Sequence, residues 1–391
     1  MAAIKDTCPG SRSGQGRIII VGAGLFGAVV AERIASVWQR HVIVIDKRPH
    51  IGGNCWSEVD AETGVEYHKY GSHIFHTSNQ EVWDYITRFA AFNDYRHTVL
   101  TIHRGEVFPM PINLGTINQY YRKAMSPDEA RSLVRAEAAK ENIRRPANLE
   151  EKAISLIGRP LYEAFFRGYT MKQWEKDPRE LSPDIITRLP VRYNYDRYYF
   201  SDKYEGIPLC GYGRLIAKIL EHPLITVRTS CDWHSYRAAV SSGDLIIYTG
   251  APDEFFDYSL GELEWRTVDF EVERPACADY QGTTVMNYAD ENVPFTRIHE
   301  FKHYHPERPD TKKTIIFKEF SRFARRGDEP FYPVFTERNK RLHSDYLAWG
   351  KEKMPNVIFG GRLGLYKYLD MDDTVAEALT MFSALQSGSA E

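Results

Sequence analysis

Residues 17–27, Arg-Ile-Ile-Ile-Val-Gly-Ala-Gly-Leu-Phe-Gly, hold the features that decide the fold. The β-branched run Arg17–Val21 predicts a buried strand, and the glycines after it predict a tight turn. A helix is expected over residues 28–37, followed by a second strand over His41–Ile45 that ends at Asp46. Strand, glycine turn, helix, strand and acid within about 30 residues form a βαβ unit of the dinucleotide-binding type.

Each glycine of this turn has a separate physical task. Gly22 permits the tight turn, Gly24 lets the backbone approach a pyrophosphate, and Gly27 lets helix and strand pack closely. The helix N-terminus offers N–H groups and a partial positive charge to the phosphates. The carboxylate of Asp46 is placed to accept hydrogen bonds from ribose hydroxyls. A glycine turn without a ligand is the alternative, and the strand and acid around it disfavour that interpretation.

The next stretch distinguishes FAD from NAD. Residues 46–54, Asp-Lys-Arg-Pro-His-Ile-Gly-Gly-Asn, resemble the acid-then-GG pattern of FAD proteins related to glutathione reductase and the amine oxidases. Gly360-Gly-Arg362, near the C-terminus, fits such folds, in which the chain returns to cover the flavin. A surface turn is the alternative for the two glycines, but their place directly after the acid favours FAD.

Composition excludes several other classes. The net charge of −3, from 50 basic and 53 acidic residues, does not fit a nucleic-acid binder, which needs a clustered positive surface. The five cysteines are scattered and show no metal-type spacing, as is typical of a reducing compartment. The polar N-terminus has no signal-peptide core, and no apolar run approaches the roughly 20 residues of a membrane span. We therefore expect a cytoplasmic protein that binds neither nucleic acid nor membrane.

The fold class expected is α/β, with a Rossmann-like FAD-binding domain on a parallel sheet, an inserted helical bundle and an antiparallel β-sheet domain. Expected boundaries are a disordered tail at 1–16; the FAD-binding domain at 17–77, about 205–260 and 345–391; a mainly helical domain at about 78–187, with a mobile loop near 178–190; and an antiparallel substrate domain at about 188–204 plus 261–344.

Several longer strings resemble the bacterial type of the flavin-dependent UDP-galactopyranose mutase family, in order from about Arg17 to Leu385. They are Tyr70-Gly-Ser-His-Ile-Phe-His76-Thr, Leu161-Tyr-Glu-Ala-Phe-Phe-Arg-Gly-Tyr-Thr-Met-Lys-Gln-Trp174, Arg188-Leu-Pro-Val-Arg-Tyr-Asn-Tyr-Asp, Met286-Asn-Tyr288, Pro294-Phe-Thr-Arg297-Ile and Gly361-Arg-Leu-Gly-Leu-Tyr-Lys-Tyr-Leu-Asp-Met-Asp372. Strings of this length are far more specific than a glycine motif.

The resemblance implies an isomerase that interconverts UDP-galactopyranose and UDP-galactofuranose and supplies the latter for cell-surface glycan synthesis. In the family, N5 of reduced FAD attacks the sugar C1, UDP leaves, and the flavin–sugar adduct opens and recloses. A cofactor nucleophile agrees with the lack of a recognisable Ser/His/Asp, Cys/His or paired-carboxylate pattern in the sequence. The family also implies a homodimer.

Residue roles carried over by the resemblance fall into three groups. The catalytic group is Arg188, Arg297 and His76. The cofactor group is Gly22, Gly24, Phe26, Gly27, Asp46, Lys47, Gly53, Asn54, His73, Ile74, Arg362, Asp370 and Met371. The substrate group is Phe165, Phe166, Tyr169, Thr170, Trp174, Arg188, Tyr199, Asn287, Arg297, Tyr332, Tyr366, Tyr368 and His97. The two arginines would clamp the diphosphate, the tyrosines would donate hydroxyls to it, and the aromatic residues of 165–174 would hold uracil.

Less specific interpretations accompany these roles. Any single arginine could form a surface ion pair, and Phe165 and Phe166 could simply pack their helix. His73 and His76, as a lone His-x-x-His pair, indicate a structural role rather than a metal site. The position of His97 resembles one where some family members have Asn beside the sugar and others have His. A helix beginning at 370–372 would stabilise anionic reduced flavin, and the Pro178–Pro190 stretch, with three prolines, reads as a lid carrying Arg188.

Two other functions share the fingerprint. A redox flavoenzyme with the amine oxidase-like fold would need no diphosphate clamp, and a non-catalytic nucleotide-binding regulator would need no intact substrate positions.

Overall fold

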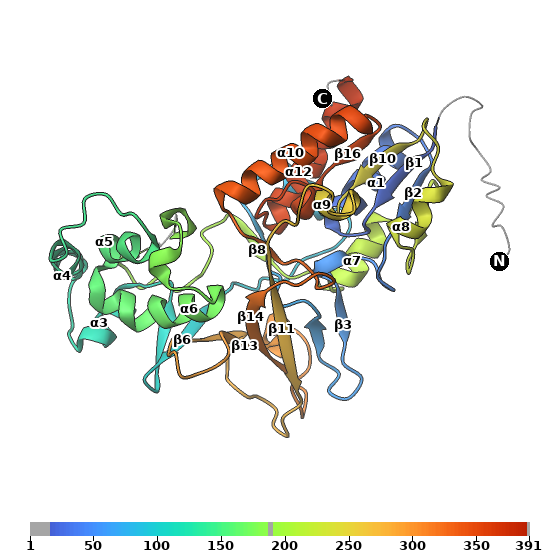
Figure 1. The fold of residues 1–391 in the computed structure, drawn as a ribbon. Helices are drawn as coiled ribbons and strands as arrows, with labels where there is room; N and C mark the ends of the chain where they lie inside the picture. Colours follow the sequence, from blue (N-terminus) through green and yellow to red (C-terminus); the bar gives the residue numbers. More distant parts are fainter. Residues whose placement is uncertain (1–15, 187–190, 389–391) are drawn as a thin grey trace.

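The computed structural model describes residues 16–186 and 191–388. Figure 1 shows three parts: a sheet with helices on both faces, a group of helices coloured green, and a second sheet near β11, β13 and β14. Blue, yellow and red segments meet in the first part, so widely separated stretches of chain build it together. Residues 187–190, which include Arg188, lie outside the described residues.

A parallel sheet forms the first part. Its five strands are β1 (Ile18–Val21), β2 (Val42–Ile45), β9 (Ile225–Arg228), β10 (Leu245–Tyr248) and β16 (Val357–Phe359), in the order β16-β10-β1-β2-β9. Every neighbouring pair in it is parallel. The Rossmann-like α/β fold expected from residues 17–46 is therefore confirmed.

Helices cover both faces of this sheet, which explains the uninterrupted apolar strands. Ile18 and Ile20 of β1 face one core, and Ile19 between them faces the other. The first core is covered by α1 (Leu25–Val37), α7 (Tyr212–Ile219) and α12 (Met371–Ser387), with α2 (Gln80–Ile86) beside them. The second core is covered by α8 (Trp233–Tyr236), α9 (Pro252–Phe255) and α10 (Glu337–Lys353).

The second sheet contains both parallel and antiparallel strand pairs. Its seven strands are β6 (Val99–His103), β7 (Glu106–Met110), β11 (Trp265–Glu273), β12 (Val285–Tyr288), β13 (Arg297–Glu300), β14 (Ile316–Phe323) and β15 (Tyr332–Pro333), in the order β15-β11-β14-β13-β12-β6-β7. The β6–β7 hairpin, expected within the helical domain, adds to this sheet through β12. Because β6 and β12 run parallel, the sheet is mixed rather than purely antiparallel.

The helical part comprises α3 (Leu114–Tyr121), α4 (Pro127–Ala139), α5 (Leu149–Tyr162), a π-helical turn (Glu163–Arg167) and α6 (Gly168–Trp174). Ser126 caps α4 in a capping box with Glu129, as its sequence predicts. Gly158 interrupts α5 with a φ of 75°. Two 3₁₀ turns, Pro178–Glu180 and Pro183–Ile186, occupy the described part of the stretch expected to be a loop.

The remaining elements are short. They are β3 (Ser57–Val59), β4 (Glu66–His68), β5 (Phe75–Thr77), β8 (Tyr204–Gly206), α11 (Gly361–Gly364) and the 3₁₀ turns Gly53–Cys55, Arg237–Ala239 and Phe301–Tyr304. The cysteines at 55, 210, 231 and 277 are free. Among the described residues, no helix is long and apolar enough to cross a membrane.

Lys172 joins the helical part to the second sheet. From α6, its ammonium group donates to the backbone oxygens of Tyr288 at 2.7 Å, Asp290 at 2.9 Å and Phe295 at 3.1 Å. The first of these carbonyls ends β12, and the other two belong to the turn between β12 and β13. One cation therefore fixes the turn against the helix by satisfying three acceptors.

We expect Gly27→Ala to lower the free energy of unfolding by about 1–3 kcal/mol, the usual cost of overpacking. A Cβ at residue 27 would lie 2.0 Å from the carbonyl oxygen of Gly22 and 3.2 Å from Cγ2 of Ile20. Urea unfolding followed by circular dichroism measures the change. Gly243→Ala is the control, because a Cβ there meets no atom within 4 Å. Equal midpoints for the two variants would show that the close contact relaxes without cost.

Lys172→Met should also destabilise the protein by about 1–3 kcal/mol, because it leaves three backbone acceptors without their donor. Urea unfolding followed by circular dichroism measures this change as well. Lys340→Met is the control, since Lys340 pairs with Glu337 on exposed helix surface. A Lys172→Met midpoint equal to that of the control would mean that Lys172 does not hold the turn.

Candidate active site

A cavity of about 1200 Å³ lies where the three parts meet. It is lined by every residue of the predicted cofactor group: Gly22, Gly24, Phe26, Gly27, Asp46, Lys47, Gly53, Asn54, His73, Ile74, Arg362, Asp370 and Met371. It is also lined by most of the predicted catalytic and substrate residues: His76, His97, Phe165, Phe166, Tyr169, Tyr199, Asn287, Arg297, Tyr332 and Tyr368. One cavity therefore joins the dinucleotide fingerprint to the expected substrate residues.

The glycine turn leaves room beside the start of α1. Gly22 has a φ of 111°, a conformation that favours glycine. Gly24 caps α1 and forms a backbone bridge with Gly52. A Cβ on Gly24 would have only the Cα of Gly53 nearby, at 3.8 Å. The space in front of Gly24 thus belongs to the cavity, where helix N–H groups can bind a phosphate.

Asp46 organises the same end of the cavity. One carboxylate oxygen accepts from the backbone N–H of Ala23 and the other from that of Arg48, both at 2.8 Å. The acid therefore ties the glycine turn to the segment after β2. A carboxylate held in this way faces the cavity with its remaining acceptor capacity.

Arg48 was not singled out from the sequence. Its guanidinium pairs with Glu329 at 2.7 Å, donates to Asn54 at 2.8 Å and lies over the ring of Tyr70 at 4.4 Å. Its Nη1 is buried without a hydrogen-bond partner among the described residues. A buried donor of this kind is costly unless a ligand satisfies it.

A second cation lies near the start of α12. Burial lowers the pKa of Arg362, with only the partial opposition of groups such as Tyr332 and Tyr368. Among residues 16–186 and 191–388, no carboxylate forms an ion pair with it. Asp370 and Met371, at the first turn of α12, line the same wall. A helix N-terminus beside an arginine favours an anion.

Strand register builds the opposite wall. Thr101 on β6 pairs with Asn287 on β12, Asn287 with Arg297 on β13, and Arg297 with Glu319 on β14. Directly paired residues share one face of a sheet, and all four line the cavity. The side-chain oxygen of Asn287 is buried without a partner in the described chain, so it is available to a ligand.

Arg297 is the charged centre of this wall. Its Nε lies 3.3 Å from Glu319 without hydrogen-bond alignment, and its Nη2 donates to the hydroxyl of Tyr169. Burial by itself would lower the pKa of Arg297, but Glu319 and nearby tyrosines raise it well above its usual value. Burial would raise the pKa of Glu319, but Arg297 and His299 hold it at about 2. The pair is therefore fully ionised.

The aromatic residues of 165–174 do not all reach the cavity. Phe165, Phe166 and Tyr169 line it. Thr170 and Trp174 do not line it in this structure, and Trp174 packs against the core of the helical part. The π-helical turn at 163–167 changes which side chains of this segment face inward.

The tyrosines likewise divide into two groups. Tyr199, Tyr332 and Tyr368 line the cavity, and the rings of Tyr332 and Tyr368 stack at 5.6 Å. Tyr366, expected to donate to the diphosphate, is 4% exposed and does not line it. Its hydroxyl donates to the backbone oxygen of Glu264 at 2.6 Å and accepts from the N–H of Val334 at 3.1 Å. The assignment of Tyr366 to the substrate is therefore corrected to a structural role.

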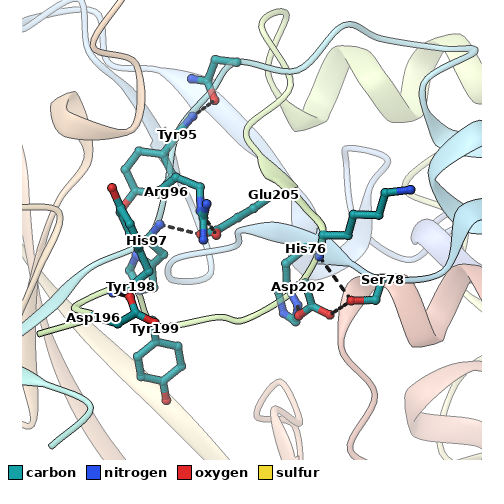
Figure 2. Close-up of polar contacts among 12 residues, drawn as sticks. His76, Ser78, Tyr95, Arg96, His97, Asp196, Tyr198, Tyr199, Asp202 and Glu205 are labelled. Carbon is teal, nitrogen blue, oxygen red and sulfur yellow. Dashed lines mark hydrogen bonds and ion pairs between the residues drawn. The ribbon is translucent and has the colours of Figure 1, made fainter. Parts of the chain in front are cut away.

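Figure 2 shows His76 and His97 on neighbouring segments, each near a carboxylate. His76 bonds Asp202 at 2.9 Å and stacks on the ring of Phe200. His97 is 6% exposed, and its Nδ1 lies 2.8 Å from the hydroxyl of Tyr95. Burial lowers the pKa of His97 to about 3, with Arg297 adding to the effect. The ring is neutral and held in one orientation.

The sequence contained no recognisable Ser/His/acid pattern, yet the fold assembles one. Ser72 lies 2.5 Å from Nδ1 of His299, whose Nε2 lies 2.9 Å from Glu319. All three line the cavity. The signal was present in part: Arg297 and His299 are two apart on a strand, so they share a face. Neither Ser72 nor Glu319 could be paired with them before the strand register was known.

His73 and His76 belong to no cluster with metal-ligand spacing in the described chain. Within the described residues, the ligand-type side chains close enough together to share a metal ion are Asp279, Glu300 and His303. None of these three residues lines the cavity. Both oxygens of Glu300 accept backbone N–H groups, from Tyr280 and Gln281 at 2.9 Å.

Comparison with known proteins identifies the relatives of this chain. The UDP-galactopyranose mutase family model matches residues 164–368, and a model described as NAD(P)-binding Rossmann-like domain matches 20–89. A dTDP-fucopyranose mutase of Escherichia coli is 40% identical over 93% of this chain and 96% of its own length. A probable UDP-galactopyranose mutase of Klebsiella pneumoniae is 43% identical over 93% of this chain and 92% of its own.

Among solved structures, one described as reduced UDP-galactopyranose mutase has a TM-score of 0.75 at 16% identity, covering 96% of this chain and 95% of that one. At that identity the match concerns the fold alone. The family model and the relatives above 30% identity, together with the cavity that joins a dinucleotide turn to a wall of polar residues, show that the chain belongs to the UDP-galactopyranose mutase family.

Proposed function

We propose that this protein interconverts UDP-galactopyranose and UDP-galactofuranose, with FAD as a cofactor that is active when reduced. The observation that supports this best is the single cavity, which joins a dinucleotide-binding turn to the ionised Arg297. A redox flavoenzyme has no need of such a cation opposite its cofactor. We further propose a cytoplasmic homodimer whose product serves cell-surface glycan synthesis, as the family resemblance implies.

The residues present fit a flavin dinucleotide. The space in front of Gly24 accepts the pyrophosphate at the N-terminus of α1. The buried, unpartnered Nη1 of Arg48 and the Arg362 guanidinium are donors that an anionic cofactor would satisfy. When bound, reduced flavin supplies through N5 the nucleophile that attacks the sugar C1.

The protein's own residues would bind and orient the substrate. Arg297, together with Arg188, stabilises the charge that develops on the departing diphosphate. Tyr332 and Tyr368 offer hydroxyl groups at the same wall. The free side-chain oxygen of Asn287 accepts a hydrogen bond from the nucleotide or sugar. Because Asn287 and Arg297 stand on paired strands of the sheet, these two groups keep their positions between substrates.

His97 would contact the sugar as a neutral ring, since its lowered pKa removes the charge. His76 would hold its position beside the cofactor through Asp202 and Phe200. Phe165, Phe166 and Tyr169 line the part of the cavity formed by the helices, where a flat base can stack.

Product analysis tests the proposal. The dithionite-reduced enzyme, given UDP-galactofuranose, should form UDP-galactopyranose on chromatography. A parallel reaction uses dTDP-fucopyranose, because a relative of that name is 40% identical. If the enzyme converts only dTDP-fucopyranose, the proposed mutase reaction stands, but the proposed substrate is wrong. Oxidised sugar as the product would favour the redox alternative.

Gly24→Val should abolish flavin binding while the fold persists. The branched side chain would enter the space reserved for the pyrophosphate, but a Cβ there touches little of the protein itself. The purified wild type should be yellow with a flavin spectrum and the variant colourless, while the circular dichroism spectra of the two proteins stay alike; the urea midpoint of the variant should match that of wild type stripped of flavin. A folded and fully yellow variant would show that this turn is not the cofactor site.

Activity should require reduced flavin even though no net oxidation occurs. With radiolabelled substrate, cyanoborohydride trapping during turnover should leave label in the flavin fraction and none on the polypeptide. Equal rates with oxidised enzyme, or label on a side chain, would rule out the proposed chemistry.

Arg188→Ala should lower kcat by about 10²–10³, the usual loss when a donor to a developing charge is removed. Lys at this position should restore activity only partly, since it keeps the charge but loses the planar fork. Flavin content and melting temperature serve as controls and should stay near wild type. A near-normal kcat/KM for Arg188→Ala would refute the clamp, and equal protease sensitivity with and without UDP would refute a lid at 178–190.

A further inference from the structure

Two hydrogen bonds join Ser72 to His299 and His299 to Glu319 behind Arg297, and we call these three residues the relay. The donor and the acceptor of each bond can be assigned. The ionised Glu319 can only accept hydrogen bonds, so Nε2 of His299 must carry a hydrogen and donate to it across 2.9 Å. Burial lowers the pKa of His299, although Glu319 opposes this, so the ring is neutral. Its Nδ1 is then a bare acceptor, and the hydroxyl of Ser72 must donate to it across 2.5 Å. Every hydrogen of the relay is thereby placed.

The relay connects different parts of the molecule. Arg297, His299 and Glu319 lie on β13 and β14 of the seven-stranded sheet. Ser72 lies in the loop between β4 and β5, whose next residues, His73 and Ile74, line the cavity. β5 in turn packs beside α12, which covers the nucleotide-binding sheet.

Glu319 depends on this support. One of its oxygens faces Arg297 at 3.3 Å and accepts from Thr296 at 3.3 Å, and the other faces His299. Glu319 is almost fully buried, so an oxygen without a donor would be costly. Without His299, the carboxylate would turn its second oxygen toward Arg297, the charged donor already 3.3 Å from its first oxygen. A two-point pair of that kind draws the guanidinium toward the sheet and away from a substrate diphosphate.

We propose that His299 is a positioning residue of the active site, which holds Glu319 so that Arg297 remains directed into the cavity, and that Ser72 orients the His299 ring. The inference rests on the proposed function, in which Arg297 receives a diphosphate. It makes UDP affinity, rather than flavin binding, the property that depends on the relay.

The test compares His299→Leu with His299→Gln in the flavin-loaded enzyme. Leu fills the site without polar atoms. Gln keeps a donor for Glu319 and an acceptor for Ser72. UDP affinity is measured by titration calorimetry and turnover by product analysis. His299→Leu should weaken UDP binding and kcat/KM by about 10- to 100-fold, the usual effect of removing a hydrogen bond to a buried charge. His299→Gln should recover most of that loss.

Two further variants separate positioning from folding. His305→Leu removes a matched contact away from the cavity, since His305 is buried and lies 2.8 Å from Glu307. It should leave UDP affinity unchanged. Ser72→Ala acts on the relay from its other end, and adding it to His299→Leu should cause no further loss, because the ring it orients is gone. Ser72→Ala also provides a folded test if His299→Leu does not fold.

The outcomes separate the two proposals. Equal loss of UDP affinity in His299→Leu and His299→Gln, additive effects of Ser72→Ala, or unchanged affinity in His299→Leu would each overturn the relay. A wild-type enzyme that binds UDP but converts neither nucleotide sugar would overturn the proposed function alone, since the relay is judged by UDP affinity. A wild-type enzyme that binds no UDP would overturn both.

Discussion

A half-buried guanidinium opposite a nucleotide-binding turn needs a counter-charge, and Glu319 supplies it across one strand pair. Taking most of the Arg297 side chain out of water is costly unless an acid and further hydrogen bonds accompany it. Glu319 lies directly opposite in the register, and His299 and Thr296 support the acid in turn. The pairing keeps the cation charged in the absence of a ligand. Because Nε of Arg297 is not aligned on Glu319, the acid balances the charge without forming a two-point pair with the guanidinium.

The same register places the neighbouring polar groups. Thr101, Asn287, Arg297 and Glu319 stand on four adjacent strands in one row. The parallel pairing of β6 with β12 extends the row by one strand, so the β6–β7 hairpin contributes to the site. Lys172 then fixes the turn between β12 and β13 to α6, which carries Tyr169. Hydrogen bonds from a side chain to three backbone oxygens thus help to hold the sheet wall and the helical wall together.

The opposite wall is built from positions where side chains are small or absent. Gly27 must lack a side chain because the turn carbonyl of Gly22 lies against it, whereas Gly24 has space in front of it. Gly27 therefore allows the helix to pack closely on the turn, and Gly24 leaves the cavity open to a ligand. The chain adds cations around that space, Arg48 and Arg362, from segments more than 300 residues apart in sequence. An open, cation-flanked turn at a helix N-terminus suits a dinucleotide far better than a neutral ligand.

The sequence by itself determined the βαβ unit and the family, because these depend on local periodicity, glycine spacing and long strings. It also predicted the cofactor-binding residues, all of which line the cavity. Tertiary structure decided which side chains face inward. Trp174 packs against the core of the helical part and does not line the cavity, and Tyr366 is occupied by backbone partners from two other segments. The Ser72–His299–Glu319 relay could not be predicted, since its members lie 227 and 20 residues apart and meet only through strand register and a loop contact. Local patterns depend on neighbours in the chain, whereas a buried hydrogen-bond network depends on neighbours in space.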